Sequence, residues 1–137
     1  MKFIGLNGKK KTLSRSERFL IDWNGGSRSK FQERVKKFLN PYWRFDFVYE
    51  EFPIVGTRLS LDFYNQTKRI AVEVQGSQHV KYSPFMHQGS KVNFLTQIQR
   101  DGKKLDFCEK NDIVLVEIYP SDDLDAEKIY ERFGVRL

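Results

Sequence analysis

The chain of 137 residues carries 24 lysines and arginines against 18 aspartates and glutamates, which gives a formal net charge of +6. With 39% hydrophobic and 31% charged residues it can form one domain with its own core, which excludes a disordered or fibrous protein. No apolar run reaches membrane-spanning length and the single cysteine excludes an intramolecular disulfide, so we expect a cytoplasmic protein without membrane contact. The excess of basic residues favours a polyanionic partner.

The first part of the chain is basic and poor in apolar residues. We expect residues 1–28 to form a basic arm and residues 29–137 to form the single folded domain. Two interpretations of the arm stay open, namely a solvated tail and a segment that contacts DNA phosphates. In the second case the candidate contacts are Lys9, Lys10, Lys11 and Arg15.

Three stretches beyond the arm have helical character. The first begins at Ser29, which has capping-box spacing with the glutamine three residues later. It is expected to end at the Asn40–Pro41 step, because proline has no backbone donor to continue a helix. The second helix is predicted over residues 90–111 and the third over residues 121–134.

Four segments have the pattern of strands: residues 43–52, 58–64, 69–75 and 112–120. The second and third are expected to form a hairpin closed by a four-residue loop at 65–68. The order is therefore helix, strand, strand, strand, helix, strand, helix. This order predicts an α/β fold with a mixed four-stranded sheet and flanking helices.

Acidic residues interrupt these elements at three positions. Asp62 and Glu73 are predicted to project from one face of the hairpin as diagonal neighbours within about 7 Å. Asp101 occupies a place in the apolar stripe expected along the second helix. The other members of that stripe are Phe94, Ile98, Leu105 and Cys108. An acid on the core-facing side of a helix costs stability unless it has a partner or a metal.

A histidine follows the second acidic strand. His79 is a candidate general base, because an imidazole titrates near neutral pH. With the three carboxylates it predicts a site for a hard divalent cation, Mg²⁺ or Mn²⁺, that activates water and stabilises a pentavalent phosphate. Taken one at a time, these residues have plainer interpretations, an ion pair for each acid and an ordinary loop position for the histidine.

The segment LDFYNQTKRIAVEVQGSQH, residues 61–79, resembles the active-site hairpin of the PD-(D/E)xK nuclease superfamily. That hairpin carries an aspartate on one strand and Glu-x-Lys on the next. The predicted order of elements also resembles the αβββαβ, restriction-endonuclease-like core of that superfamily. Gln75 stands where the lysine is expected. This departure is similar to the Vsr-like branch, the very-short-patch repair endonucleases and phage Glu-Asp-x-His-Asp homing endonucleases, in which a later histidine serves as the base.

The resemblance implies a metal-dependent, homing-type endonuclease that acts on double-stranded DNA in a phage or bacterial host cell. It implies three contacts to Mg²⁺ or Mn²⁺: Asp62, Glu73 and the Val74 carbonyl. Gln75 would contact the scissile phosphate or a water bound to the metal. His79 would be the base, and Asp101 would orient that histidine or hold a water near the metal.

The resemblance also implies a glutamate on the first helix. Three residues stay open for this role: Glu33 on that helix, Gln32 beside it as a substitute for the acid, and Glu51 at the end of the first strand. Further DNA contacts are expected from Lys81, Arg100 and Lys104. Because one site cuts one strand, a double-strand cut would need a homodimer or successive nicks. Two other functions stay open: a repair nickase or junction resolvase, and a non-catalytic DNA-binding protein on the same fold.

Overall fold

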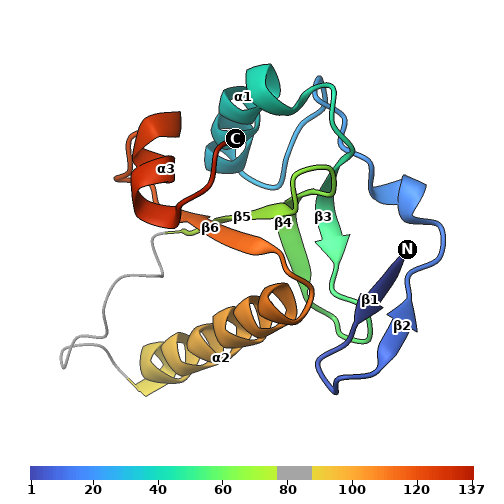
Figure 1. Ribbon diagram of the computed structural model, residues 1–137. Coiled ribbons are helices and arrows are strands. Elements are labelled where there is room, and N and C mark those ends of the chain that lie inside the picture. The colour runs from blue at the N-terminus through green and yellow to red at the C-terminus, as the bar shows by residue number, and fades with distance from the viewer. Residues whose placement is uncertain (77–87) are drawn as a thin grey trace.

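The computed structural model describes the backbone of residues 1–76 and 88–137, and the side chains of residues 1–76 and 98–137. Its central feature is a sheet of four strands in the order β3-β4-β5-β6 (Figure 1). These strands are Val48–Pro53, Ser60–Asn65, Ile70–Val74 and Val114–Ile118. The first three form antiparallel pairs, whereas β5 and β6 run parallel, as expected when a helix connects them.

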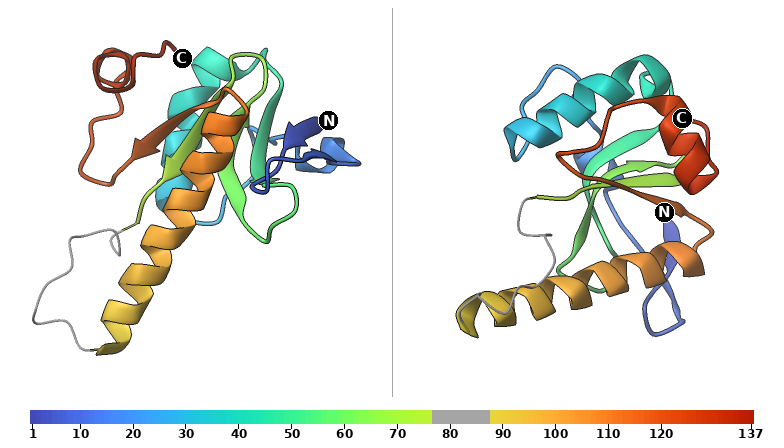
Figure 2. Two further views of the ribbon diagram at one scale, coloured as in Figure 1. Left: turned by 60° about the horizontal axis from the view of Figure 1, so that its bottom comes forward. Right: turned by 90° about the vertical axis from the view of Figure 1, so that its left-hand side faces the viewer.

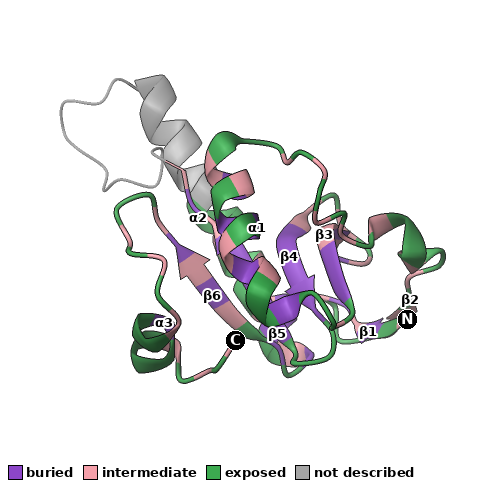
Figure 3. Cartoon of the chain, turned by 90° about the horizontal axis from the view of Figure 1, so that it is seen from above, coloured by how far each residue is buried: buried purple, intermediate pink, exposed green. Residues whose placement is uncertain are grey.

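Helices cover both faces of this sheet (Figure 2). The helices α1 (Lys30–Trp43) and α3 (Ala126–Phe133) pack on one face, and α2 (Gln88–Lys110) packs on the other. The strands between them are largely buried, as Figure 3 shows. The predicted α/β fold, a mixed four-stranded sheet with flanking helices, is confirmed.

Each face of the sheet has its own hydrophobic core. On the α1 side the fully buried side chains include Val35, Leu39, Trp43, Phe63, Val72 and Val116. On the α2 side they include Phe52, Leu61, Tyr64, Phe107 and Cys108. Burial of side chains of this size supplies most of the favourable free energy of folding.

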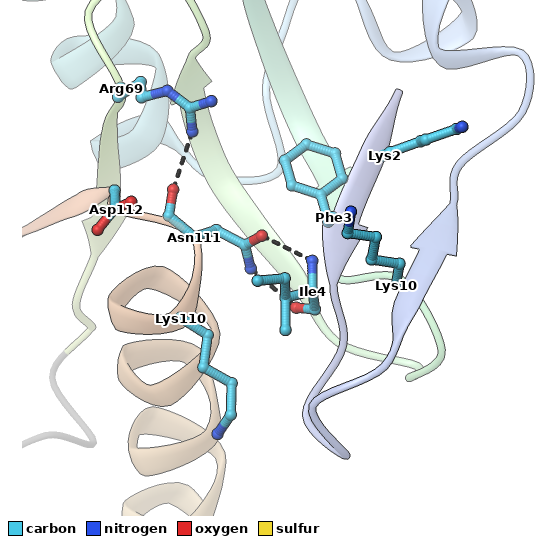
Figure 4. Close-up of a pocket in the computed structure, with 8 residues that line it drawn as sticks. All are labelled: Lys2, Phe3, Ile4, Lys10, Arg69, Lys110, Asn111 and Asp112. Atoms are coloured by element: carbon cyan, nitrogen blue, oxygen red, sulfur yellow. Dashed lines mark hydrogen bonds between the residues drawn. The ribbon is translucent and has the colours of Figure 1, made fainter.

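The N-terminal segment is folded onto the domain, which contradicts the first of the two interpretations, a solvated tail. Strands β1 (Lys2–Ile4) and β2 (Lys10–Thr12) form an antiparallel hairpin. The Phe3 ring is 6% exposed and packs in the α2-side core. Asn111, just after α2, holds β1 by accepting from the Ile4 N–H at 2.7 Å and donating to the Ile4 carbonyl at 2.8 Å (Figure 4).

The rest of residues 1–28 is also bound to the domain. A 3₁₀ helix, Ser16–Phe19, leads to a bridge between Leu20 and Tyr49 of β3. The Ile21 N–H then donates to the Val48 carbonyl at 3.0 Å. The prediction failed because a basic composition describes the exposed side chains of a hairpin as well as it describes a tail.

The first helix begins as predicted and ends later. Ser29 is its N-cap, with its hydroxyl accepting from the Gln32 N–H at 3.1 Å. Pro41 lies inside the helix, which continues to Trp43 and closes with a bond from the Arg44 N–H to the Asn40 carbonyl at 3.0 Å. Proline removes one donor near the helix end, and the last turn forms without it.

The apolar stripe predicted for α2 is wrong in part. Ile98 is 51% exposed and Leu105 is 45% exposed, whereas Phe107 and Cys108 are fully buried. Asp101 was predicted to lie on the core-facing side of this helix. Its side chain is half-buried and lies on the same side as Cys108, which is two turns further along. The position of Phe94 lies outside the described side chains.

Candidate active site

The hairpin of β4 and β5 has a different register from the one predicted. Asn65 pairs with Ile70, and Tyr64 pairs with Ala71, so the loop comprises residues 66–69. Continuing this register sets Asp62 directly opposite Glu73 rather than diagonal to it. The two acids therefore lie closer together than the sequence pattern indicated.

The sheet loses its regular alternation at the level of Asp62. Leu61 and Phe63 are two residues apart on β4, yet Leu61 packs in the α2-side core and Phe63 in the α1-side core. On β3, Glu51 has a φ of 53°, a left-handed conformation that costs a residue other than glycine about 1–3 kcal/mol. Strain of this kind persists where the surrounding contacts enforce it, and it often marks functional sites.

The two acids make direct contacts across the strand end. The Asp62 N–H donates to Oε1 of Glu73 at 3.0 Å, and the Val74 N–H donates to Oδ2 of Asp62 at 2.8 Å. Asp62 is 8% exposed and Glu73 is 4% exposed. The structure thus joins the two carboxylates in one buried arrangement, as the strand pattern predicted.

Burial makes this pair of acids electrostatically unfavourable. Desolvation raises the pKa of Glu73 to about 8, and the charge of Asp62 adds to the effect. Burial also raises the pKa of Asp62, with a further contribution from Glu51. Lys104 opposes these shifts, because its Nζ lies 2.8 Å from Oε2 of Glu73. With both pKa values raised, the pair tends to retain a proton at neutral pH. A bound cation would lower these pKa values, because its positive charge stabilises the ionised carboxylates.

Asp62 and Glu73 line a cleft with a volume of about 780 Å³. Its walls come from α1, β4, β5 and α2. Four cationic residues line it: Arg28, Arg58, Arg100 and Lys104. The first three are exposed, so the edge of the cleft is positively charged. Such a charge favours the approach of a polyanion.

Other predicted site residues fall in different places. Val74 and Gln75 line the cleft, and Gln75 is 3% exposed. Asp101 lies near the cleft, where its charge acts on Lys104. His79 and Lys81 lie outside the described residues. None of the four basic residues of the N-terminal segment is among the described residues that line the cleft: Lys9, Lys10, Lys11 and Arg15.

The structure also distinguishes the three candidates for the first-helix acid. Gln32 lines the cleft, and its amide donates to Glu50 at 2.9 Å and to Glu51 at 3.0 Å. Glu33 instead accepts from the Ser27 N–H at 3.2 Å, which holds it away from the cleft. Of the three, Glu51 is therefore the acid whose charge reaches Asp62.

A buried ion pair beside this network was missed in the sequence. Lys36 donates to Oε1 of Glu50 at 2.8 Å with only 3% of its side chain exposed, and it also donates to the Gly25 carbonyl at 3.2 Å. The available signal was the spacing of Gln32 and Lys36, which puts both on the buried side of α1. These contacts fix the loop that carries Arg28 to the cleft.

We expect Gln32→Glu to lower the free energy of unfolding by about 2–4 kcal/mol, because it sets a third carboxylate against Glu50 and Glu51 and removes their amide donor. Urea unfolding monitored by circular dichroism at pH 7 measures this loss. The matched control Gln99→Glu, at an exposed position of α2, should change stability by less than about 0.5 kcal/mol. Equal stability of the two variants would contradict the network.

We expect the stability of Glu73→Gln, relative to the unaltered protein, to increase as pH rises from about 4.5 to 8, because glutamine cannot lose a proton at this position. The folded pKa of Glu73 is about 8 against an ordinary value of 4.5. Between these values the folded chain binds the extra proton, so the stability of the unaltered protein falls as pH rises. Thermal unfolding across pH 4–9 measures the difference, with the exposed Glu109→Gln as control. A stability difference between variant and parent that stays constant across this pH range would contradict the raised pKa of Glu73.

The donor set fits a hard divalent cation. Two carboxylates in mutual repulsion, next to a strand end, offer the oxygen ligands that Mg²⁺ and Mn²⁺ prefer, and Mg²⁺ keeps several water ligands. In the part of the chain that the structure describes, no group of three His, Cys, Asp or Glu side chains could hold a metal. The protein's contribution would therefore come from Asp62, Glu73 and Val74.

No protein-family model and no solved structure matches the chain. It is 35% identical to the uncharacterized protein 094L of Frog virus 3 (isolate Goorha) over 75 residues, 54% of this chain and 48% of the relative. It is 30% identical to the uncharacterized protein 033L of Invertebrate iridescent virus 3 over 106 residues, 72% of this chain and 54% of the relative. The chain thus spans about half the length of these curated relatives, which are viral. Among the described helices, none combines the length and the apolar character that a membrane span requires.

Proposed function

We propose that this protein is a metal-dependent endonuclease that hydrolyses phosphodiester bonds in double-stranded DNA. The observation that carries the proposal is the buried pair of Asp62 and Glu73 in a cleft with a cationic edge. The resemblance of residues 61–79 to the PD-(D/E)xK hairpin supports it, since the same two acids carry that resemblance. The Vsr-like, homing-type branch is the most similar one, because Gln75 replaces the lysine.

The residues of the cleft have distinct roles in this proposal. Asp62, Glu73 and Val74 hold Mg²⁺ or Mn²⁺, which supplies Lewis-acid polarisation of a phosphate oxygen and lowers the pKa of water. Arg28, Arg58 and Arg100 neutralise phosphates on either side of the scissile bond. Gln75 donates to the scissile phosphate.

Hydrolysis forms a bond between phosphorus and a water oxygen and breaks the bond to the leaving oxygen. The attacking water loses one proton, and the leaving oxygen gains one. His79, outside the described residues, is the proposed acceptor of the water proton, with Asp101 as the residue that orients it. Acid-base catalysis of this type contributes about 10²–10⁴-fold to a rate.

DNA beyond the cleft is proposed to contact the N-terminal hairpin and its flank. Lys9, Lys10 and Arg15 are exposed there, and Lys11 is half-buried. Such contacts give an affinity that falls steeply with salt concentration and carries no sequence preference. Specificity for one long target would then require base contacts or a second copy of the chain.

The direct test is incubation of the purified protein with supercoiled plasmid and linear duplexes, with Mg²⁺ or with a chelator, followed by mapping of the cut ends. We expect cleavage that requires the metal and produces nicks from a monomer or double-strand breaks from a homodimer. Binding of DNA without cleavage under any metal condition would favour the non-catalytic alternative, which the glutamine at position 75 supports. Preferential cutting of mismatched or branched DNA would favour the repair alternative.

A further inference from the structure

The cleft contains a lysine that is largely buried and paired with one of the two acids. Lys104 comes from α2 and crosses to β5, where its Nζ lies 2.8 Å from Oε2 of Glu73. Its side chain is 15% exposed, in contrast to the exposed arginines at the edge of the cleft.

Lys104 is placed among several acids at once. The charges of Glu73, Asp62 and Asp101 all act on its ammonium group, and the contact with Glu73 is direct. A buried ammonium group is costly unless it is paired, and here the pairing fixes its position beside the acids. The cation is thus held in place before any ligand enters, which is the arrangement that makes electrostatic stabilisation effective.

The strand itself offers no cation at this level. Gln75, just beyond the end of β5, follows Glu73 by two residues, but its amide is neutral. Both residues line the same cleft as Lys104. In the described part of the cleft, the positive charge in direct contact with the acid pair therefore comes from α2. Its lysine lies 31 residues after Glu73 in the sequence.

We propose that Lys104 is a catalytic residue, whose ammonium group contacts a non-bridging oxygen of the scissile phosphate and offsets the negative charge that develops as water adds. It keeps its proton throughout and holds Glu73 in position from the same nitrogen. This inference rests on the proposed nuclease function. It predicts that the cleft needs a cation beside Glu73, and that a cation supplied from position 75 can replace the one from the helix.

The test compares plasmid cleavage in Mg²⁺ by the unaltered protein, Lys104→Met, Lys104→Arg, the control Lys103→Met, and the double variant Lys104→Met with Gln75→Lys. Lys103 is the exposed neighbour on the same helix. We expect Lys104→Met to lose at least about 100-fold in single-turnover rate. Its DNA affinity at fixed salt should change less than threefold, Lys103→Met should stay near the parent rate, and the double variant should recover at least about tenfold.

The outcomes separate this inference from the function on which it rests. A parent protein that cuts no DNA overturns both. A parent that cuts DNA, with Lys104→Met equally active, overturns the inference alone. A loss of cleavage rate by Lys104→Met that its loss of DNA affinity or of thermal stability fully explains also overturns the inference. A folded double variant that recovers no cleavage activity overturns it as well. Activity retained by Lys104→Arg and restored by Gln75→Lys supports the inference, because a purely structural residue would not be replaced from another strand.

Discussion

Replacing Asp62 by alanine should abolish DNA cleavage, with a loss of at least about 10³-fold, while DNA affinity changes by less than about threefold. Asp62 lies within the buried acid pair, and its Oδ2 accepts from the Val74 N–H. Removing it takes away a carboxylate that the proposed metal requires. The exposed arginines proposed to neutralise phosphates remain in place, so we expect binding to be retained.

Three measurements check this result. Plasmid cleavage gives the rate, fluorescence anisotropy with a labelled duplex gives the affinity, and calorimetry with Mg²⁺ gives the binding heat, which should disappear. Asp62→Asn preserves the acceptor for Val74 and should be equally inactive, which separates lost charge from lost structure. Asp106→Ala is the matched control, because Asp106 is an acid of α2 that pairs with Lys110 on the surface. Full activity of purified Asp62→Ala would refute the site.

The order of elements could be predicted from the sequence because it depends on local patterns. Alternating residues marked β4 and β5, and the Ser29 cap marked the start of α1. The two acids of the site were found by the same period-two pattern, although their register was off by two positions. The left-handed residue at Glu51, which accompanies the break in alternation, has no local signal because tertiary contacts enforce it.

The contacts that the sequence did not reveal join distant segments. Lys104 contacts Glu73, which lies 31 residues earlier in the sequence. The periodicity of a helix predicts which side a lysine is on, but not which strand that side contacts. The stripe on α2 was misplaced for the same reason, since Phe107 and Cys108 are the fully buried apolar side chains in the part of the helix whose side chains the structure describes. Charge patterns predicted a cationic protein correctly but could not assign individual cations to the cleft or to the surface.

Replacing Phe3 by alanine should destabilise the protein by about 3–5 kcal/mol and lower the melting temperature by about 10–15 °C. The Phe3 ring packs against three aromatic rings, with centroid distances of 5.6 Å to Phe52, 6.1 Å to Tyr64 and 5.6 Å to Phe107. Alanine would leave a cavity among rigid rings that cannot collapse to fill it. Urea unfolding and thermal scans measure the loss.

The control is Phe45→Ala, which removes the same side chain where it is 88% exposed and should change stability by less than about 0.5 kcal/mol. If Phe3→Ala were equally harmless, residues 1–12 would behave as the free arm that their composition suggests. A large loss has a further consequence for the site. Phe52 and Tyr64 are neighbours of Glu51 and Asp62 along β3 and β4, so the hairpin supports the part of the sheet where the alternation breaks. In that case the N-terminal hairpin stabilises, through its packing on Phe52 and Tyr64, the part of the sheet that carries the acid pair. This role is independent of any contact with DNA.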